Sequence, residues 1–156
     1  GELFCLSAGI KAVHLPFKGA PEALTEVIAG RSDYYFAPLV NAMPLLKDGQ
    51  IVALAVAGSQ RASALPDVPT TVQAGFAESE YNFWAGVFVP SKTPAEIKKK
   101  LYDEIAKALA SPGVASKLKE LGADPMPITS AQYDALVKRE IETNRKIAKA
   151  ANIKVN

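Results

Sequence analysis

The sequence contains few of the side chains that catalysis and metal binding require. Its 156 residues include one cysteine, one histidine and one tryptophan. A single cysteine excludes an intrachain disulfide framework, and no group of Cys and His residues has the spacing of a metal site. The glycine-rich phosphate loops and the nucleophile elbow of many hydrolases are also missing. The sequence therefore predicts no catalytic residue, no metal ligand and no cofactor.

Charge and hydropathy argue against two further classes of protein. The net charge of +2 is too small to predict binding to nucleic acid or to a membrane surface, and the lysines are spread along predicted helices. No apolar run reaches the roughly 18 residues of a membrane span. With 49% apolar and 22% charged residues, the chain is typical of a folded domain or of parts of two domains.

The first 57 residues alternate between predicted strands and helices. Strands are predicted over 11–17, 33–37 and 51–57, the last apolar enough to be covered on both faces, and helices over 20–29 and from 38 to 48. This order predicts an α/β fold with a mostly parallel sheet and right-handed crossovers. Pro44 lies inside the second helix and is expected to kink or split it.

The chain opens on a predicted helix over residues 1–8 that ends at Gly9. No capping residue precedes this helix, so we expect the native N-terminus to lie upstream, and the sequence shows no signal peptide. Further along, 59–76 is a long connection with one helical turn, and 82–89 is a predicted strand. Three helices follow, beginning near Thr93, Ser111 and Thr129; the first and third carry the capping-box pattern.

The turn at Lys18-Gly19, between the first strand and its helix, is the best candidate for a binding site. Glycine lets a ligand approach the backbone, the helix start offers free N–H groups, and lysine adds positive charge. All three features favour a carboxylate or a phosphate. The alternative interpretation is an ordinary turn with a solvated lysine.

Several other residues are weaker candidates for a catalytic or binding role. His14 lacks an acidic or Cys partner nearby in sequence, and Cys5 is predicted to be a buried, inert thiol. Ala37-Pro38 is the equivalent corner of the next strand–helix unit, with Asn41 either lining a cleft or facing solvent. Trp84 belongs either to the core or to a pocket wall.

Several motifs, in the same order, resemble the Bug family, the TctC-type receptors of tripartite tricarboxylate transporters. His14-Leu15-Pro16-Phe17-Lys18-Gly19-Ala20 is similar to the family's H-V-P-Y-K-G-S run. Asp33 to Pro38 with Asn41 to Pro44, then Gly49 with Ala53 to Val56, resemble two further family regions. Arg61 with Leu65-Pro66-Asp67-Val68-Pro69-Thr70 and Ala74-Gly75, Trp84 with Gly86 to Pro90, Thr93-Pro94 and Leu121-Gly122-Ala123 complete the set. The run from Leu65 to Thr70 is the most specific of these.

The resemblance implies a periplasmic, type II two-domain receptor of the Venus flytrap kind, with parallel sheets and flanking helices. Such receptors capture small organic carboxylates for a membrane transporter and are not enzymes. The chain is then the C-terminal half: residues 1–80 form most of ligand-binding domain 2, and 81–156 return to domain 1. Its expected partners are a small carboxylate, the transporter subunits, and the missing N-terminal half or a second copy.

The resemblance places the ligand between two domains, with its carboxylate on backbone N–H groups at helix starts. The residues expected to bind it are Pro16, Phe17, Lys18, Gly19, Ala20, Ala37 and Pro38. Phe17 replaces the family's usual Tyr, and Ala37-Pro38 stands where many members have Asp-Asn. Both changes make this side more apolar, which favours an aromatic or medium-chain dicarboxylate over an amino acid.

Two rival functions remain open. A small α/β enzyme acting on an anionic substrate would use Lys18 or His14, although no nucleophile–base pair can be assembled from the sequence. A structural or sensory module of the same fold would bind no ligand and would show no ligand-induced thermal shift.

Overall fold

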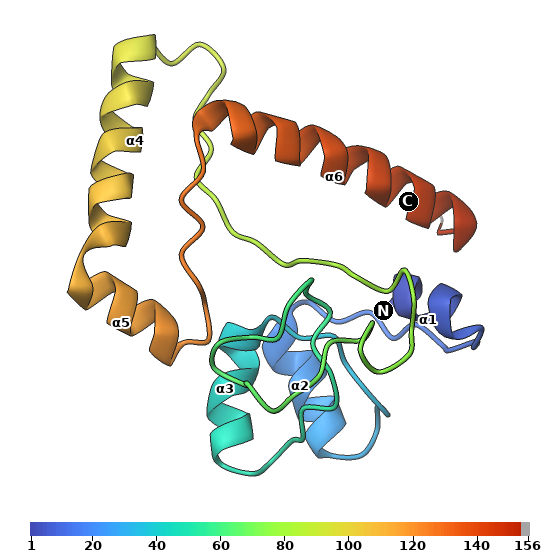
Figure 1. Cartoon of the computed structure of the whole chain (residues 1–156). Helices are drawn as coiled ribbons and strands as arrows, with labels where there is room; N and C mark the ends of the chain where they lie inside the picture. Colours follow the sequence, from blue (N-terminus) through green and yellow to red (C-terminus); the bar gives the residue numbers. More distant parts are fainter. Residues whose placement is uncertain (154–156) are drawn as a thin grey trace. The chain divides into compact units, whose positions relative to one another are not determined.

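The computed structural model describes residues 1–153, in which six α-helices are connected by long irregular segments (Figure 1). The helices are α1 (Glu2–Ala8), α2 (Ala20–Ile28), α3 (Leu39–Lys47), α4 (Ala95–Ala110), α5 (Pro112–Glu120) and α6 (Ser130–Ala150). All six were predicted, in this order. Pro44 lies inside α3 without splitting it, since the helix continues to Lys47.

The chain forms two compact units. Unit 1 comprises Gly1–Phe83 together with Leu121–Ala123, and unit 2 comprises 84–120 and the chain from Asp124 onward. The sequence did not predict that residues 121–123 return to unit 1. The assignment of residues 1–80 to a ligand-binding domain and of 81–156 to a second domain stays a prediction.

The core of unit 1 is small and lies at the middle of α2 and α3. Its buried apolar side chains are Ala23 and Leu24 of α2 and Ala42 and Met43 of α3. The two helices lie side by side and run in the same direction (Figure 1). Because the helices are in contact and run in parallel, both helix N-termini lie at one end of the pair.

The strands predicted over 11–17, 33–37, 51–57 and 82–89 are not formed as strands within residues 1–153. A single parallel bridge, between Val56 and Thr70, is the only β-pairing in this range. A strand needs a neighbour about 4.8 Å away to pair its N–H and C=O groups. The described backbone hydrogen bonds join no two of the predicted strands. The sequence pattern predicts which segments suit a sheet, but it does not predict which segments lie next to one another.

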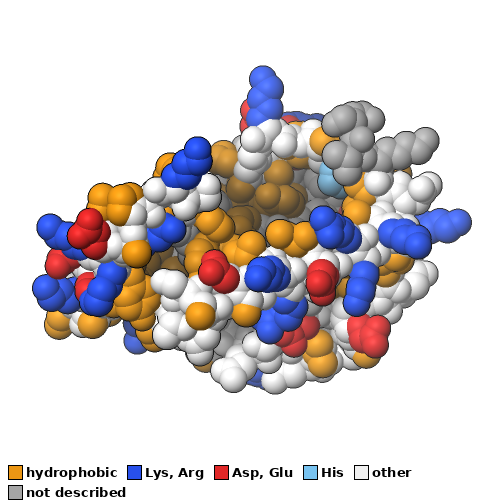
Figure 2. All heavy atoms as spheres, turned by 90° about the horizontal axis from the view of Figure 1, so that it is seen from above, with side chains coloured by type: hydrophobic (Ala, Val, Ile, Leu, Met, Phe, Trp, Pro, Cys, Tyr) orange, Lys and Arg blue, Asp and Glu red, His pale blue; other side chains and the backbone are white. Residues whose placement is uncertain are grey.

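Apolar side chains on the predicted strands are consequently open to solvent. Val13 is 86% exposed, Val52 79% and Leu54 77%, so the segment 51–57 is not covered on both faces as predicted. Figure 2 shows apolar side chains reaching the surface over broad areas of the face in view.

Buried polar side chains fasten the long connection after residue 58. The Ser79 hydroxyl lies 2.6 Å from both Thr71 Oγ1 and the Phe76 carbonyl oxygen, and Ser79 and Thr71 are buried. The Gln73 N–H donates to Thr70 Oγ1 at 3.0 Å, and the Thr70 N–H donates to Gln73 Oε1 at 3.1 Å. These bonds cap a single turn at residues 71–75, as predicted for this connection.

Arg61 ties the two ends of this connection together. Its Nε donates to Gln73 Oε1 at 3.0 Å, and its terminal nitrogen donates to the Pro66 carbonyl oxygen at 2.8 Å. The run Leu65–Thr70, which carries the most specific part of the family resemblance, therefore has a structural role in shaping the connection. It bridges to Val56 through the Val56 N–H, which donates to the Pro69 carbonyl at 2.9 Å.

Helix α1 is held by aromatic side chains. The Phe4 ring centroid lies 4.8 Å from that of Phe76 and 5.3 Å from that of Phe36. Gly9 ends the helix in a left-handed conformation with φ 65°, which confirms its predicted role after the helix. This cluster joins residues near the start of the chain to the end of the long connection.

Unit 2 shows that only one of the two predicted capping boxes forms. At the start of α6, the Gln132 N–H donates to Thr129 Oγ1 at 3.2 Å, and the Thr129 N–H donates to Gln132 Oε1 at 2.8 Å. Helix α4 instead begins at Ala95, with Pro94 as its N-cap and no side-chain capping bond. The box predicted at Thr93 is wrong because Thr93 lies one residue before the cap position.

Tyr133 anchors α6 to the segment that follows residue 83. Its ring centroid lies 5.3 Å from those of Trp84 and Phe88, so Trp84 packs in an aromatic cluster. A Cβ added to Gly86 would lie 2.0 Å from Tyr133 Oη, which explains why this position is glycine. The Tyr133 hydroxyl is buried and has no hydrogen-bond partner among residues 1–153, and desolvation raises its pKa.

We expect Thr129→Ala to lower the free energy of unfolding by about 0.5–2 kcal/mol, because it removes a capping bond. Thr93→Ala is the matched control and should change it by less than about 0.5 kcal/mol, since no capping bond is lost. Urea denaturation followed by circular dichroism measures both. Equal losses for the two variants would contradict the assigned caps.

We expect Gly86→Ala to cost about 1–3 kcal/mol of stability through overpacking against Tyr133. Tyr133→Phe alone should not destabilise, because it removes a buried hydroxyl that has no described partner. The double variant should recover part of the loss, since the hydroxyl oxygen is the atom nearest the new methyl group. Thermal denaturation of the three variants checks this, and strict additivity would rule it out.

Candidate functional site

The first predicted binding corner lies at the start of α2 and is open to solvent. Pro16, Phe17, Lys18 and Gly19 are exposed, and Ala20, the first residue of the helix, is half-buried. The first turn of a helix leaves backbone N–H groups without intrahelical partners, and these groups carry the positive end of the helix dipole. The corner therefore presents backbone N–H donors and the positive charge of Lys18 to solvent.

A carboxylate of the chain itself already occupies part of this corner. The Lys18 N–H donates to Glu22 Oε2 at 3.1 Å. Glu22 lies in the first turn of α2, where a negative charge is favoured by the helix dipole. The sequence analysis missed this contact, although the acidic residue four positions after Lys18 was a usable signal. The Lys18 N–H is therefore already paired with a carboxylate of the chain itself.

Nothing in the fold requires glycine at position 19. Its φ of 175° and ψ of 176° are extended values that any residue adopts. A Cβ added there would meet only Pro21 Cδ, at an ordinary contact distance of 3.7 Å. Neither backbone strain nor packing explains the glycine, and the space in front of the backbone stays open to another molecule.

The second predicted corner lies at the start of α3. Ala37 and Pro38 are half-buried, and Pro38 is the N-cap with φ −56° and ψ 129°. No side chain caps the helix, so the first-turn N–H groups of α3 are not taken up by a cap. Asn41 is exposed, and its backbone N–H donates to the Pro38 carbonyl at 2.9 Å.

The structure brings these two corners to the same end of the α2–α3 pair. The two helices are in contact and run in parallel (Figure 1). Two parallel helix dipoles then present their positive ends on one side. An arrangement of this kind favours an anion, and the apolar Phe17 and Pro38 side chains favour an apolar body on it.

The other residues considered for chemistry have structural partners. Cys5 is half-buried, with its sulfur 3.2 Å from the Tyr34 hydroxyl. The hydrogen bond to Cys5, with burial, raises the pKa of Tyr34 to about 12, so the phenol stays protonated at neutral pH. His14 lies 3.9 Å from the carboxylate of Glu2, and its side chain is 71% exposed. Among residues 1–153, no group of three or more His, Cys, Asp or Glu side chains could hold a metal ion.

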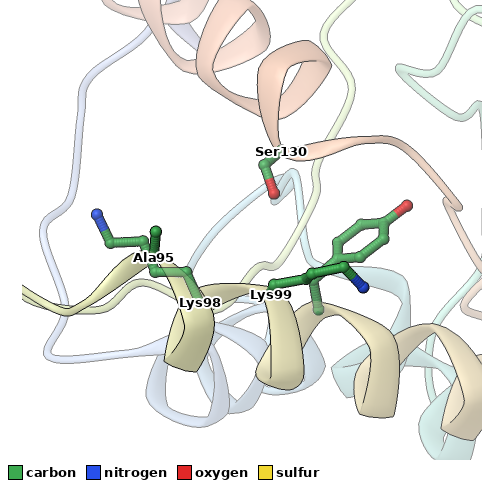
Figure 3. A pocket seen from close by; sticks show the side chains of 5 residues that line it. Ala95, Lys98, Lys99 and Ser130 are labelled. Atoms are coloured by element: carbon green, nitrogen blue, oxygen red, sulfur yellow. The ribbon is translucent and has the colours of Figure 1, made fainter.

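A shallow hollow in unit 2 is lined by Ala95, Lys98, Lys99, Tyr102 and Ser130. Figure 3 shows the Ser130 hydroxyl directed into it, while the Lys98 and Lys99 side chains extend in opposite directions. Lys98 Nζ donates to the Ser91 carbonyl at 3.3 Å, and Lys99 Nζ lies 2.5 Å from Asp103 Oδ2. Both ammonium groups already have oxygen partners. The hollow is therefore lined by the aliphatic parts of the two lysines and has no free positive charge for an anion.

Sequence relatives cover nearly all of this chain. The profile of the family described as "Tripartite tricarboxylate transporter family receptor" (TctC) matches residues 1–153. The "UPF0065 protein in the TAR-I ttuE-ttuC' intergenic region" of Agrobacterium vitis is 32% identical over 97% of this chain and 44% of its own length. Within residues 1–153, no helix has the length and apolar character needed to cross a membrane.

Solved structures of similar proteins share the fold. A "periplasmic transporter" matches with a TM-score of 0.89 and 31% identity, over 99% of this chain and 52% of that chain. "R. palustris Rpa4515 with adipate" matches with a TM-score of 0.87 and 32% identity, over 97% and 50%. "MatC (Rpa3494) from Rhodopseudomonas palustris with bound malate" matches with a TM-score of 0.83 and 32% identity, over 93% and 50%.

These similarities confirm the fold class predicted from the sequence, that of periplasmic binding proteins, and the resemblance on which it rested. The chain spans about half the length of the solved structures that it matches. The family profile matches nearly the whole chain, residues 1–153. The chain belongs to the TctC family of tripartite tricarboxylate transporter receptors.

Proposed function

We propose that this chain is the part of a periplasmic receptor that holds the carboxylate of a small organic acid and delivers it to membrane transporter subunits. The observation that carries the proposal is the pairing of two open helix starts at one end of α2 and α3. Glu22 on the Lys18 N–H supports it, since one carboxylate already binds there. Adipate and malate in the two Rhodopseudomonas palustris structures support the same ligand class.

We propose that the ligand is held by Pro16, Phe17, Lys18, Gly19, Ala20, Ala37 and Pro38. Backbone N–H groups of the two corners and the Lys18 ammonium bind a carboxylate, while Phe17 and Pro38 contact the body of the ligand. A medium-chain dicarboxylate such as adipate fits this combination better than aspartate or glutamate, because the Phe17 and Pro38 side chains are apolar. Ligand binding closes the two-domain receptor, because only the closed state contacts the ligand from both sides.

Binding rather than catalysis is the function favoured by the contacts of the reactive side chains. Cys5 is hydrogen-bonded to Tyr34, and His14 has Glu2 as its nearest acidic group. A substitution of Lys18 separates the two functions: a receptor loses affinity for its ligand, whereas an enzyme loses turnover.

We further propose that the open apolar segments pair with the rest of the receptor, either the N-terminal half or a second copy of this chain. Segments 11–17, 51–57 and 82–89 expose large apolar side chains, with Phe83 67% and Phe88 67% exposed. Backbone N–H and C=O groups of an extended segment also need a partner strand or water. Relatives about twice as long supply the chain length that such pairing requires.

Gly19→Ala is the sharpest test of the site, because the fold tolerates a methyl group there. We expect unchanged thermal stability and adipate affinity reduced about tenfold or more, since the ligand can no longer reach the backbone. Gly113→Ala in α5, where an added Cβ meets nothing within 4 Å, is the matched control. Isothermal titration of adipate, malate and aspartate measures the affinities.

Lys18→Met should weaken adipate binding by about tenfold or more through loss of a charge-assisted hydrogen bond, and Lys47→Met should not. Binding of aspartate or glutamate alone would contradict the proposed ligand class. If the wild-type chain bound neither adipate nor malate, or bound them equally well without Lys18, the proposed site would be wrong.

We expect the purified chain to have a native mass above 16.6 kDa, because its open apolar segments associate with another polypeptide. Intact mass under denaturing conditions then identifies the companion: one species at 16.6 kDa indicates a second copy, and an additional species indicates the other half. A native mass of 16.6 kDa at micromolar concentration would contradict the proposed pairing.

A further inference from the structure

Residues 121–123 form an unpredicted connection to the proposed ligand site. They lie between α5 and α6 in sequence, whose residues belong to unit 2, yet Leu121, Gly122 and Ala123 belong to unit 1. All three are half-buried. We call this three-residue segment the connector, because the chain leaves unit 2 to form it and returns to unit 2 immediately afterwards.

The connector packs against the start of α3 through bare backbone. A Cβ on Gly122 would lie 2.8 Å from Leu39 Cγ and 2.9 Å from Met43 Cγ, closer than side chains tolerate. Gly122 also has a φ of 73°, in the left-handed region that favours glycine. Met43 is one of the four buried apolar residues of α2 and α3, so the connector packs on the core of unit 1.

Leu39 links the connector to the proposed site directly. It is the first residue of α3 and follows Pro38, one of the residues assigned to ligand binding. Leu39 is therefore adjacent to the Ala37–Pro38 corner in sequence and lies next to Gly122 in space. Packed side chains transmit shifts of their neighbours because close-packed groups cannot absorb them.

We propose that the connector positions the start of α3, so that ligand occupancy at the Ala37–Pro38 corner is coupled to the packing of residues 121–123, with Leu39, Met43 and Gly122 as positioning residues. The proposal rests on the proposed function, because the ligand site is its starting point.

Hydrogen exchange measured by mass spectrometry on the full chain tests the packing without any ligand. Gly122→Ala should speed exchange of the amides in the first turn of α3 by about tenfold or more. Gly49→Ala is the matched control: it has a φ of 67° just after the same helix, but nothing lies within 4 Å of its added Cβ. The Gly49→Ala variant shows the effect of backbone strain from an alanine with positive φ, without a steric clash at its Cβ.

A double variant keeps the test decisive where Gly122→Ala alone fails to fold. Leu39→Ala removes the isobutyl group that the new methyl group meets first, so Leu39→Ala with Gly122→Ala should be less damaged than the two single effects combined. Additive damage in the double variant, or equal exchange in Gly122→Ala and Gly49→Ala, would overturn the packing role of the connector.

Adipate added to the same samples tests the coupling. In the wild-type chain, adipate should slow exchange both at the start of α3 and at residues 121–124, and Gly122→Ala should abolish the second effect. Slowed exchange at α3 with none at 121–124 in the wild type would overturn the coupling while leaving the ligand site intact. No adipate effect anywhere would instead overturn the proposed function, and with it the coupling, and the ligand-free comparison would still decide whether the connector packs as described.

Discussion

The packing of α2 against α3 is the interaction on which the rest of unit 1 depends. Ala23, Leu24, Ala42 and Met43 are the buried apolar side chains of these helices, and they lie at the middle of each helix. Without this contact the parallel helix dipoles would not point to one side, and the corners at Gly19 and Pro38 would be separate turns. Structural stability and the proposed binding site therefore share the same few side chains.

The extended segments set the second constraint, because an unpaired strand cannot satisfy its backbone. Apolar side chains such as Val13, Val52 and Leu54 belong to a sheet interior by their type, yet they are exposed here. The helices form from local hydrogen bonds and so are complete within the chain. A sheet is completed only by neighbouring strands, and within residues 1–153 the predicted strands have no such neighbour.

Motif specificity and ligand contact turn out to be different properties. The Leu65–Thr70 run carries the most specific part of the family resemblance, and its described contacts are internal, through Arg61, Gln73 and Val56. Lys18 and Gly19 form a less specific pattern, but they lie at an open corner that already holds the Glu22 carboxylate. A family motif can thus be specific for residues that shape a connection within the fold.

By itself the sequence determined the order of the helices, the family, and the local endings such as Gly9 and the Thr129 cap, because these depend on neighbours within a few residues. The cap predicted at Thr93 was wrong, because the helix begins one residue later than predicted. The Thr93 side chain therefore does not accept a hydrogen bond from a backbone N–H of the first turn. Only the tertiary structure decided which segments meet: the absence of ladders between the predicted strands in residues 1–153, the placing of two corners on one side, and the return of Gly122 to α3. Those outcomes depend on contacts between residues far apart in sequence, for which periodicity and spacing carry no signal.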